Sequence, residues 1–171
     1  MMPTSEKPSL LDTPLKRWFP LNVETLLVVL LLAVAVVSRF YDLGARTMSH
    51  DEINHVVPTF SLYSGNGYKY DPMSHGPFQY HMMALSYALF GDNDFTTRIP
   101  AAVLSIAAFL VAVFAFRRYL GRTGALVAGA LIIISPLMLF YARYARNESY
   151  IVLWGIPVSY THLTLPTIYS V

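Results

Sequence analysis

Three long apolar segments dominate the hydrophobic pattern of the chain. Residues 21–40, 99–116 and 123–142 are almost entirely apolar, and the second and third contain no charged residue. A helix needs roughly 20 apolar residues to cross the hydrocarbon core of a bilayer. The first segment contains Glu24 and Arg39 near its ends, and we expect both side chains at the lipid headgroups. The pattern therefore predicts three transmembrane helices.

A shorter apolar segment, 78–90, contains Gln79 and His81. It is short for a membrane span and suits a helix that lies at the membrane interface or re-enters it. Basic residues are clustered before the first span and between the second and third, and such clusters mark the cytoplasmic side. We therefore predict an all-α polytopic membrane protein with a cytoplasmic segment 1–20 and an external loop 41–98 that carries juxtamembrane helices.

The composition agrees with a membrane protein. Hydrophobic residues make up 55% of the 171 residues and charged residues only 13%, whereas a soluble domain has about 25% charged residues. The formal net charge of +2, with no basic stripe interleaved with aromatic residues, argues against nucleic acid as a partner. The chain has no cysteine, which excludes disulfides and thiolate metal sites.

The last segment, 157–171, differs from the rest of the chain. Residues 158–171, VSYTHLTLPTIYSV, look like a sequencing adapter translated in its third reading frame. We therefore treat 157–171 as an artefact and exclude it from the fold prediction, as one would an expression scar. On this interpretation the natural protein continues, a fourth span begins near Tyr150, and the fragment alone is inactive.

Candidate catalytic residues follow the first span directly. His50, Asp51 and Glu52 are consecutive, and two adjacent carboxylates beside a membrane are costly unless they are solvated or used. A carboxylate in a partly buried cleft can be tuned to act as a general base. The alternative is a helix N-terminus, where Ser49 would be the cap and acids are favoured in the first turn. Zinc-protease chemistry is excluded because His50 and His55 are five residues apart rather than four.

His50, beside the acidic pair, is a candidate phosphate- or substrate-binding residue, and further candidates lie in two places. Lys69 and His75 belong to a Tyr- and His-rich segment whose donors could meet a phosphate, although an interfacial anchor explains the composition equally well. Arg143 and Arg146 are three residues apart, so they share a helix face and could grip a phosphate with their forked donors. Snorkelling of interfacial arginines is the alternative. With Glu148, these arginines are expected on the same side of the membrane as the acidic pair.

Taken together, these motifs resemble the GT-C superfamily of integral-membrane glycosyltransferases. The likeness is closest to the branch related to protein O-mannosyltransferases and aminoarabinose transferases, including flippase-activity-associated proteins. Four motifs, whose order and spacing match, carry the resemblance: His50-Asp51-Glu52, HGPFQYHMMALSYALFG, Arg98-Ile-Pro-Ala-Ala and ISPLMLFYARYARNE.

The resemblance implies roles for individual residues. It makes Asp51 the catalytic aspartate, with Glu52 beside it. It places the phosphate-contacting residue at His75, although His-Gly-Pro departs from the family's basic-Pro-Pro motif. It assigns the later basic and acidic positions to Arg143 or Arg146 and to Glu148. No cofactor is certain, but some members hold a divalent metal between the residues that correspond to Asp51 and Glu148.

The resulting functional hypothesis is a membrane glycosyltransferase. It would move a sugar from a polyprenyl-phosphate carrier to an acceptor hydroxyl on the extracytoplasmic face of the cell membrane, with inversion and with Asp51 as general base. Partners would be the lipid-linked donor and membrane lipid, and no motif identifies the acceptor. The alternative is a protein that binds the lipid carrier or assists its flipping without transfer chemistry. A transporter is disfavoured because the three predicted spans carry no central charge.

Overall fold

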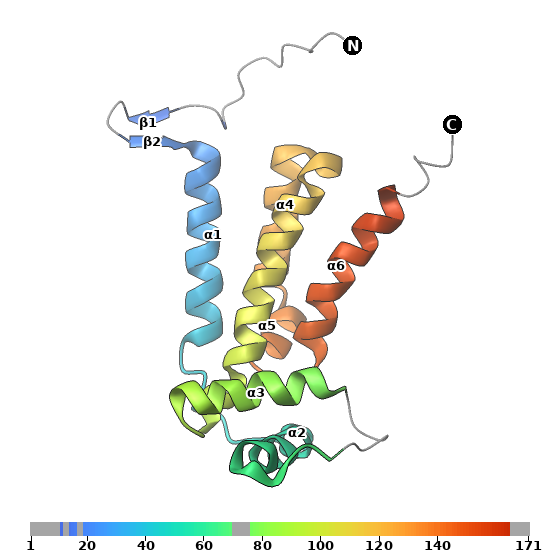
Figure 1. Ribbon diagram of the computed structural model, residues 1–171. Coiled ribbons are helices and arrows are strands. Elements are labelled where there is room, and N and C mark those ends of the chain that lie inside the picture. The colour runs from blue at the N-terminus through green and yellow to red at the C-terminus, as the bar shows by residue number, and fades with distance from the viewer. Residues whose placement is uncertain (1–10, 12–13, 17–18, 70–75, 165–171) are drawn as a thin grey trace.

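The computed structural model describes residues 11, 14–16, 19–69 and 76–164, and the fold is built from helices (Figure 1). Helices α1 (Val23–Phe40), α4 (Asp94–Ile134) and α6 (Glu148–Thr164) run along one another, with the short α5 (Pro136–Ala142) between α4 and α6. A two-stranded antiparallel hairpin, β1 (Pro14–Lys16) and β2 (Phe19–Asn22), precedes α1.

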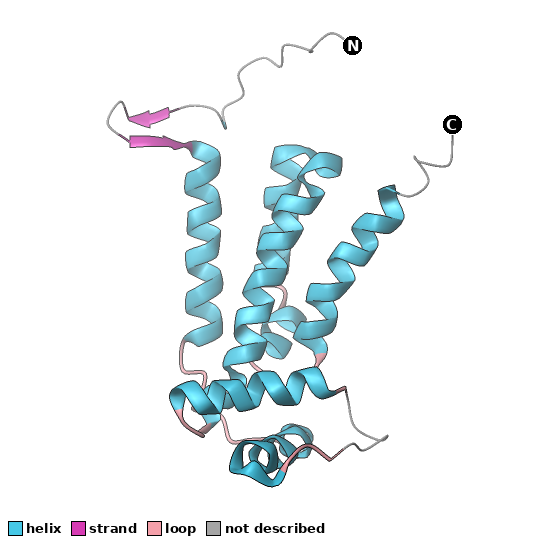
Figure 2. Cartoon of the chain, in the orientation of Figure 1, coloured by secondary structure: helices cyan, strands magenta, loops and turns pink. Residues whose placement is uncertain are grey.

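Two helices and a π-helical turn connect α1 to α4 at the end of the bundle opposite this hairpin (Figure 2). They are α2 (His50–Ser61), η2 (Leu62–Asn66) and α3 (Pro77–Phe90). The apolar segment 78–90 forms a helix, α3, which lies across the ends of the other helices. Its residue spacing buries Tyr80, Met83 and Tyr87 on one face.

Two described helices are long and apolar enough to cross a membrane, α1 and α4. The second predicted span, 99–116, lies within α4, and the third, 123–142, begins in α4 and extends through α5. Helix α4 is interrupted at Gly121, whose φ of 69° and ψ of 178° are not helical. The two limbs of α4 that meet there pack together: Gly129 lies against Val113 and Phe109, which enter the same core as Ala35 of α1.

The segment predicted as the third span, 123–142, is not one helix. Helix α4 ends before Ser135, which is extended (φ −58°, ψ 121°), and Pro136 starts α5. Proline has no N–H to continue the helix and disfavours the helical conformation of the residue before it. The segment predicted as the third span therefore has a break at Ser135 and Pro136, near its far end.

Arg39, in the last turn of α1, has a fully buried side chain that lies between α1 and α4. The guanidinium lies 3.3 and 3.4 Å from the carbonyl oxygens of Ile133 and Ile132, in the last turn of α4. These carbonyls lose their helical partners where Pro136 ends the helix, so Arg39 supplies donors that the break makes necessary.

Candidate functional site

The acidic pair begins α2, and the helix separates its two members. Ser49 caps α2: its hydroxyl accepts from the Glu52 backbone N–H at 3.3 Å, and the Glu52 carboxylate accepts from the Ser49 backbone N–H at 3.0 Å. Consecutive residues of a helix point about 100° apart. Glu52 is therefore completely buried, whereas the side chain of Asp51 is 54% exposed. The helix-cap alternative and the functional one are both compatible with this geometry.

The Glu52 carboxylate joins three segments of the chain. Arg98, at the start of α4, donates to both oxygens at 2.8 and 3.1 Å, and Arg46 donates at 3.0 Å. The backbone N–H of Ala145, in the loop before α6, donates at 3.1 Å. Burial acts to raise the pKa of Glu52, but the hydrogen bonds from Arg98, Ser49 and Ala145 and the charge of Arg98 outweigh it and lower the pKa. Glu52 therefore has a structural, bracing role: its buried carboxylate holds the three segments together and is not exposed to a substrate.

The loop 143–147 is held against α2 by these bonds. The Tyr144 hydroxyl lies 2.5 Å from the Ser49 hydroxyl, and Ala145 is anchored on Glu52. The next residue, Arg146, consequently reaches Asp51, with Nη1 2.9 Å from Oδ2. Two groups 95 positions apart in the sequence thus meet at one point.

Arg146 also lies beside Glu148. Its Nε is 3.3 Å from Glu148 Oε1, so one guanidinium contacts both acids. Arg146 Nε and Glu148 Oε2 are buried and, within the described part of the chain, make no hydrogen bond. The cluster Asp51–Arg146–Glu148 therefore has an unused donor on Arg146 and an unused acceptor on Glu148.

Arg143 does not join this cluster. Its guanidinium donates to the carbonyl oxygens of Ser38, Tyr41 and Asp42 at 2.8, 2.6 and 3.1 Å. These groups lie at and just after the C-terminus of α1, where carbonyls need outside donors. Helix-face spacing suggested that Arg143 and Arg146 point together, but the chain leaves the helix at Arg143 and the two side chains diverge.

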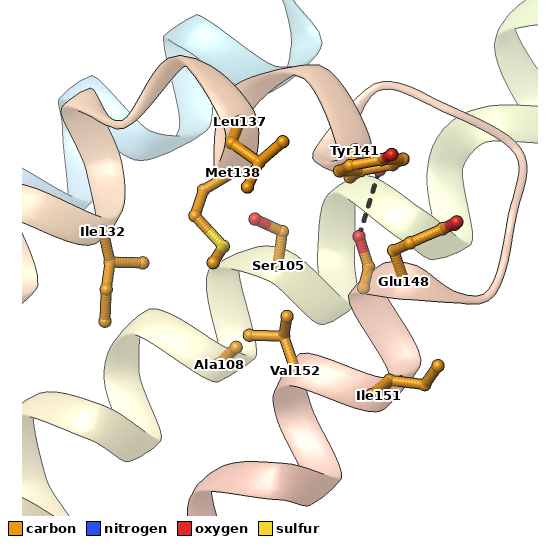
Figure 3. Close-up of a pocket in the computed structure, with 10 residues that line it drawn as sticks. Ser105, Ala108, Ile132, Leu137, Met138, Tyr141, Glu148, Ile151 and Val152 are labelled. Atoms are coloured by element: carbon orange, nitrogen blue, oxygen red, sulfur yellow. Dashed lines mark hydrogen bonds between the residues drawn. The ribbon is translucent and has the colours of Figure 1, made fainter.

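Two apolar cavities flank the start of α6, next to the cluster. The first, of about 230 Å³, lies between α4, α5 and α6 and reaches Glu148 (Figure 3). Beside it the Ser149 hydroxyl donates to the Tyr141 carbonyl oxygen at 3.2 Å. The second, of about 610 Å³, lies between α3 and α6 and is lined by Phe78, Tyr150 and Trp154 among others. A polar cluster beside apolar cavities suits a ligand with a charged head and a hydrocarbon tail.

The remaining predicted site residues lie apart from the cluster or outside the description. His50 and Lys69 are exposed. His75 lies outside the described residues, so its predicted role is untested. Sequence reasoning missed Arg98 as the main partner of Glu52, although its position just before an apolar span marked it as a buried or interfacial charge that needs an acid.

A divalent metal fits this arrangement poorly. Asp51 and Glu148, the expected ligands, are both bound to the guanidinium of Arg146, which takes the place that a cation would need. Among the described residues no group of three or more acids, histidines or cysteines could hold a metal ion.

The chain was compared with protein-family models, curated proteins and solved structures, and a family model matches it. Residues 74–165 match the family model described as dolichyl-phosphate-mannose-protein mannosyltransferase. No curated protein and no solved structure matches the chain. The family match ends at residue 165 and α6 ends at Thr164. The assignment of 157–171 to adapter sequence stays a prediction. Because the match covers more than half of the chain, the protein belongs to the dolichyl-phosphate-mannose-protein mannosyltransferase family, a family of membrane glycosyltransferases.

Proposed function

We propose that the complete protein transfers a sugar from a polyprenyl-phosphate carrier to an acceptor hydroxyl, with Asp51 as general base. The observation that carries this proposal is the contact of Asp51 with Arg146 at 2.9 Å. It brings a solvent-accessible carboxylate and a phosphate-binding type of side chain within one site, as the reaction requires. The family membership supports the donor class and the transfer reaction.

In the proposed reaction Arg146 binds the donor phosphate. The donor phosphate is a diester with one negative charge, and it can compete for the guanidinium because Arg forms forked charge-assisted bonds with phosphate oxygens. When Arg146 turns to the phosphate, Asp51 loses its partner and can accept the proton of the acceptor hydroxyl. The hydroxyl oxygen then attacks the anomeric carbon, the bond from that carbon to the phosphate oxygen breaks, and the polyprenyl phosphate leaves with the bonding electrons. One displacement inverts the anomeric carbon.

Arg146 would also stabilise the negative charge that builds on the leaving phosphate, an electrostatic effect that is often large. Glu148 would keep the guanidinium in place after it leaves Asp51. No step in this mechanism uses a metal, since Arg146 already bridges the two acids. The cavities beside α6 are the proposed place for the first part of the lipid tail.

We further propose that three segments cross the membrane as separate spans: α1, the first limb of α4, and the second limb of α4 together with α5. The non-helical Gly121 and the packing of Gly129 against Phe109 and Val113 support this reading. The site would then face the extracytoplasmic side of the cell membrane. Because the chain has no cysteine, single cysteines at Ser64 and Arg118 can be labelled without background, and labelling of both from the same side would refute this topology.

The transfer proposal is tested with Asp51→Asn in the complete protein reconstituted in liposomes. With radiolabelled mannosyl polyprenyl phosphate as donor, this variant should lose at least about 10²-fold in transfer rate, the usual contribution of a general base. Donor binding should stay close to that of the unchanged protein. Asp42→Asn, which removes another exposed acid outside the site, is the matched control and should transfer normally.

Two outcomes would count against the proposal. Near-normal transfer by Asp51→Asn would remove Asp51 as the base. Donor binding without transfer in the unchanged protein, at a level unaffected by Asp51→Asn, would favour a carrier-binding or flippase-associated protein.

A further inference from the structure

A second charged cluster lies at the opposite end of the bundle, where α1 begins and the two limbs of α4 meet (Figure 1). Arg117 donates to Glu24 at 3.1 Å, and Arg122 donates to the same carboxylate at 2.7 Å. The neighbouring Arg118 is exposed. Glu24 thus pairs with two arginines, so this cluster carries an excess of positive charge.

A hollow of about 520 Å³ opens beside this cluster. Its polar part is formed by Asn22 and Thr25, at the start of α1, together with Glu24 and the two arginines. The other part is apolar and is formed by three side chains, Val28, Val113 and Phe114. Phe114 is 61% exposed, so the apolar part continues onto the outer surface of the helices.

The charges exceed what is needed to hold the helices together. A single arginine would neutralise Glu24, yet Arg117 is added with its side chain 44% exposed. An exposed guanidinium beside an apolar wall, on a helix of a membrane protein, is placed to meet a group that is anionic at one end and hydrocarbon at the other. Basic pockets between membrane helices bind anionic lipid headgroups for this reason.

We propose that this hollow binds the headgroup of an anionic phospholipid. The lipid phosphate would bond to Arg117 and Arg122, and the glycerol and first acyl carbons would lie against Val28 and Phe114. A free phosphate has the same charge but gains nothing from the apolar wall, so the hollow favours the lipid. This site is remote from Asp51, and its occupation does not depend on the transfer reaction.

The test uses the chain in detergent micelles and native mass spectrometry to measure lipid affinity. Phosphatidylglycerol and phosphatidylcholine with identical acyl chains are the probes, and inorganic phosphate is the competitor. We expect phosphatidylglycerol to bind at least about fivefold more tightly, since one basic side chain near a lipid surface contributes about that factor. Arg117→Gln should remove this preference, whereas Arg118→Gln, the same charge change one position away, should keep it.

Three results would overturn the proposal: equal affinity for the two lipids, an equal effect of both substitutions, or displacement of phosphatidylglycerol by millimolar inorganic phosphate. Circular dichroism checks that Arg117→Gln keeps the helices. If this variant does not fold, the lipid preference and the phosphate competition of the unchanged chain still decide the matter.

Discussion

Replacing Glu52 by glutamine tests the idea that this carboxylate holds the site together. The substitution keeps the shape of the side chain but removes its charge and turns one acceptor oxygen into an NH₂ donor. That NH₂ would face the donors of Arg98, Arg46 or a backbone N–H, which now point at an acceptor. Arg98 is fully buried and would lose its counter-charge.

The magnitude follows from burial. Removing one partner of a buried ion pair costs about 3–5 kcal/mol, because the other charge stays buried without compensation. For a chain of this length, 1 kcal/mol shifts the unfolding temperature by roughly 2–4 °C. Glu52→Gln should therefore unfold about 6–20 °C below the unchanged chain.

The pH dependence has a definite sign. The pKa of Glu52 in the fold lies below its ordinary value of 4.5, so folding favours the charged form. The resulting stabilisation is complete above the ordinary pKa and is lost as the pH falls through the lowered one. The stability difference between the two chains should consequently shrink below pH 4.5 and stay constant above it.

The assay is thermal unfolding in detergent, followed by circular dichroism from about pH 3 to pH 8. Asp51→Asn is the matched control: it alters the adjacent acid, but its ion pair is exposed and contributes only about 0–1 kcal/mol. An unchanged unfolding temperature in Glu52→Gln, or an equal loss in Asp51→Asn, would refute the bracing role.

Two further substitutions test the packing and the arginines. Gly129→Ala should lower stability by about 1–3 kcal/mol through overpacking, because its Cβ would lie 2.6 Å from a side-chain carbon of the other limb; Gly155→Ala, where nothing lies within 4 Å, is the control and should cost nothing. Arg143→Gln should reduce stability by about 1–3 kcal/mol, since its charged hydrogen bonds to carbonyls are lost, and leave donor affinity nearly unchanged. Unaltered stability with weakened donor binding would instead place Arg143 at the phosphate.

The site shows where sequence reasoning reached its limit. Both members of the acidic pair were candidates, because adjacent carboxylates look alike in a sequence. Only the start of α2, fixed by the Ser49 cap, turned Glu52 inward and Asp51 outward. Arg143 and Arg146 shared a predicted helix face, but the helix ends between them and Ser49–Tyr144 packing sets the direction of the loop.

The sequence by itself indicated the membrane class and the main apolar helices, because apolar run length and composition are local properties. It also predicts that the segment 78–90 is too short to span. The tertiary structure decided which charges meet: Arg98 with Glu52, Arg146 with Asp51 and Arg39 with the broken end of α4. Those pairings join residues far apart in the chain, and their choice depends on how the helices pack, which no local pattern encodes.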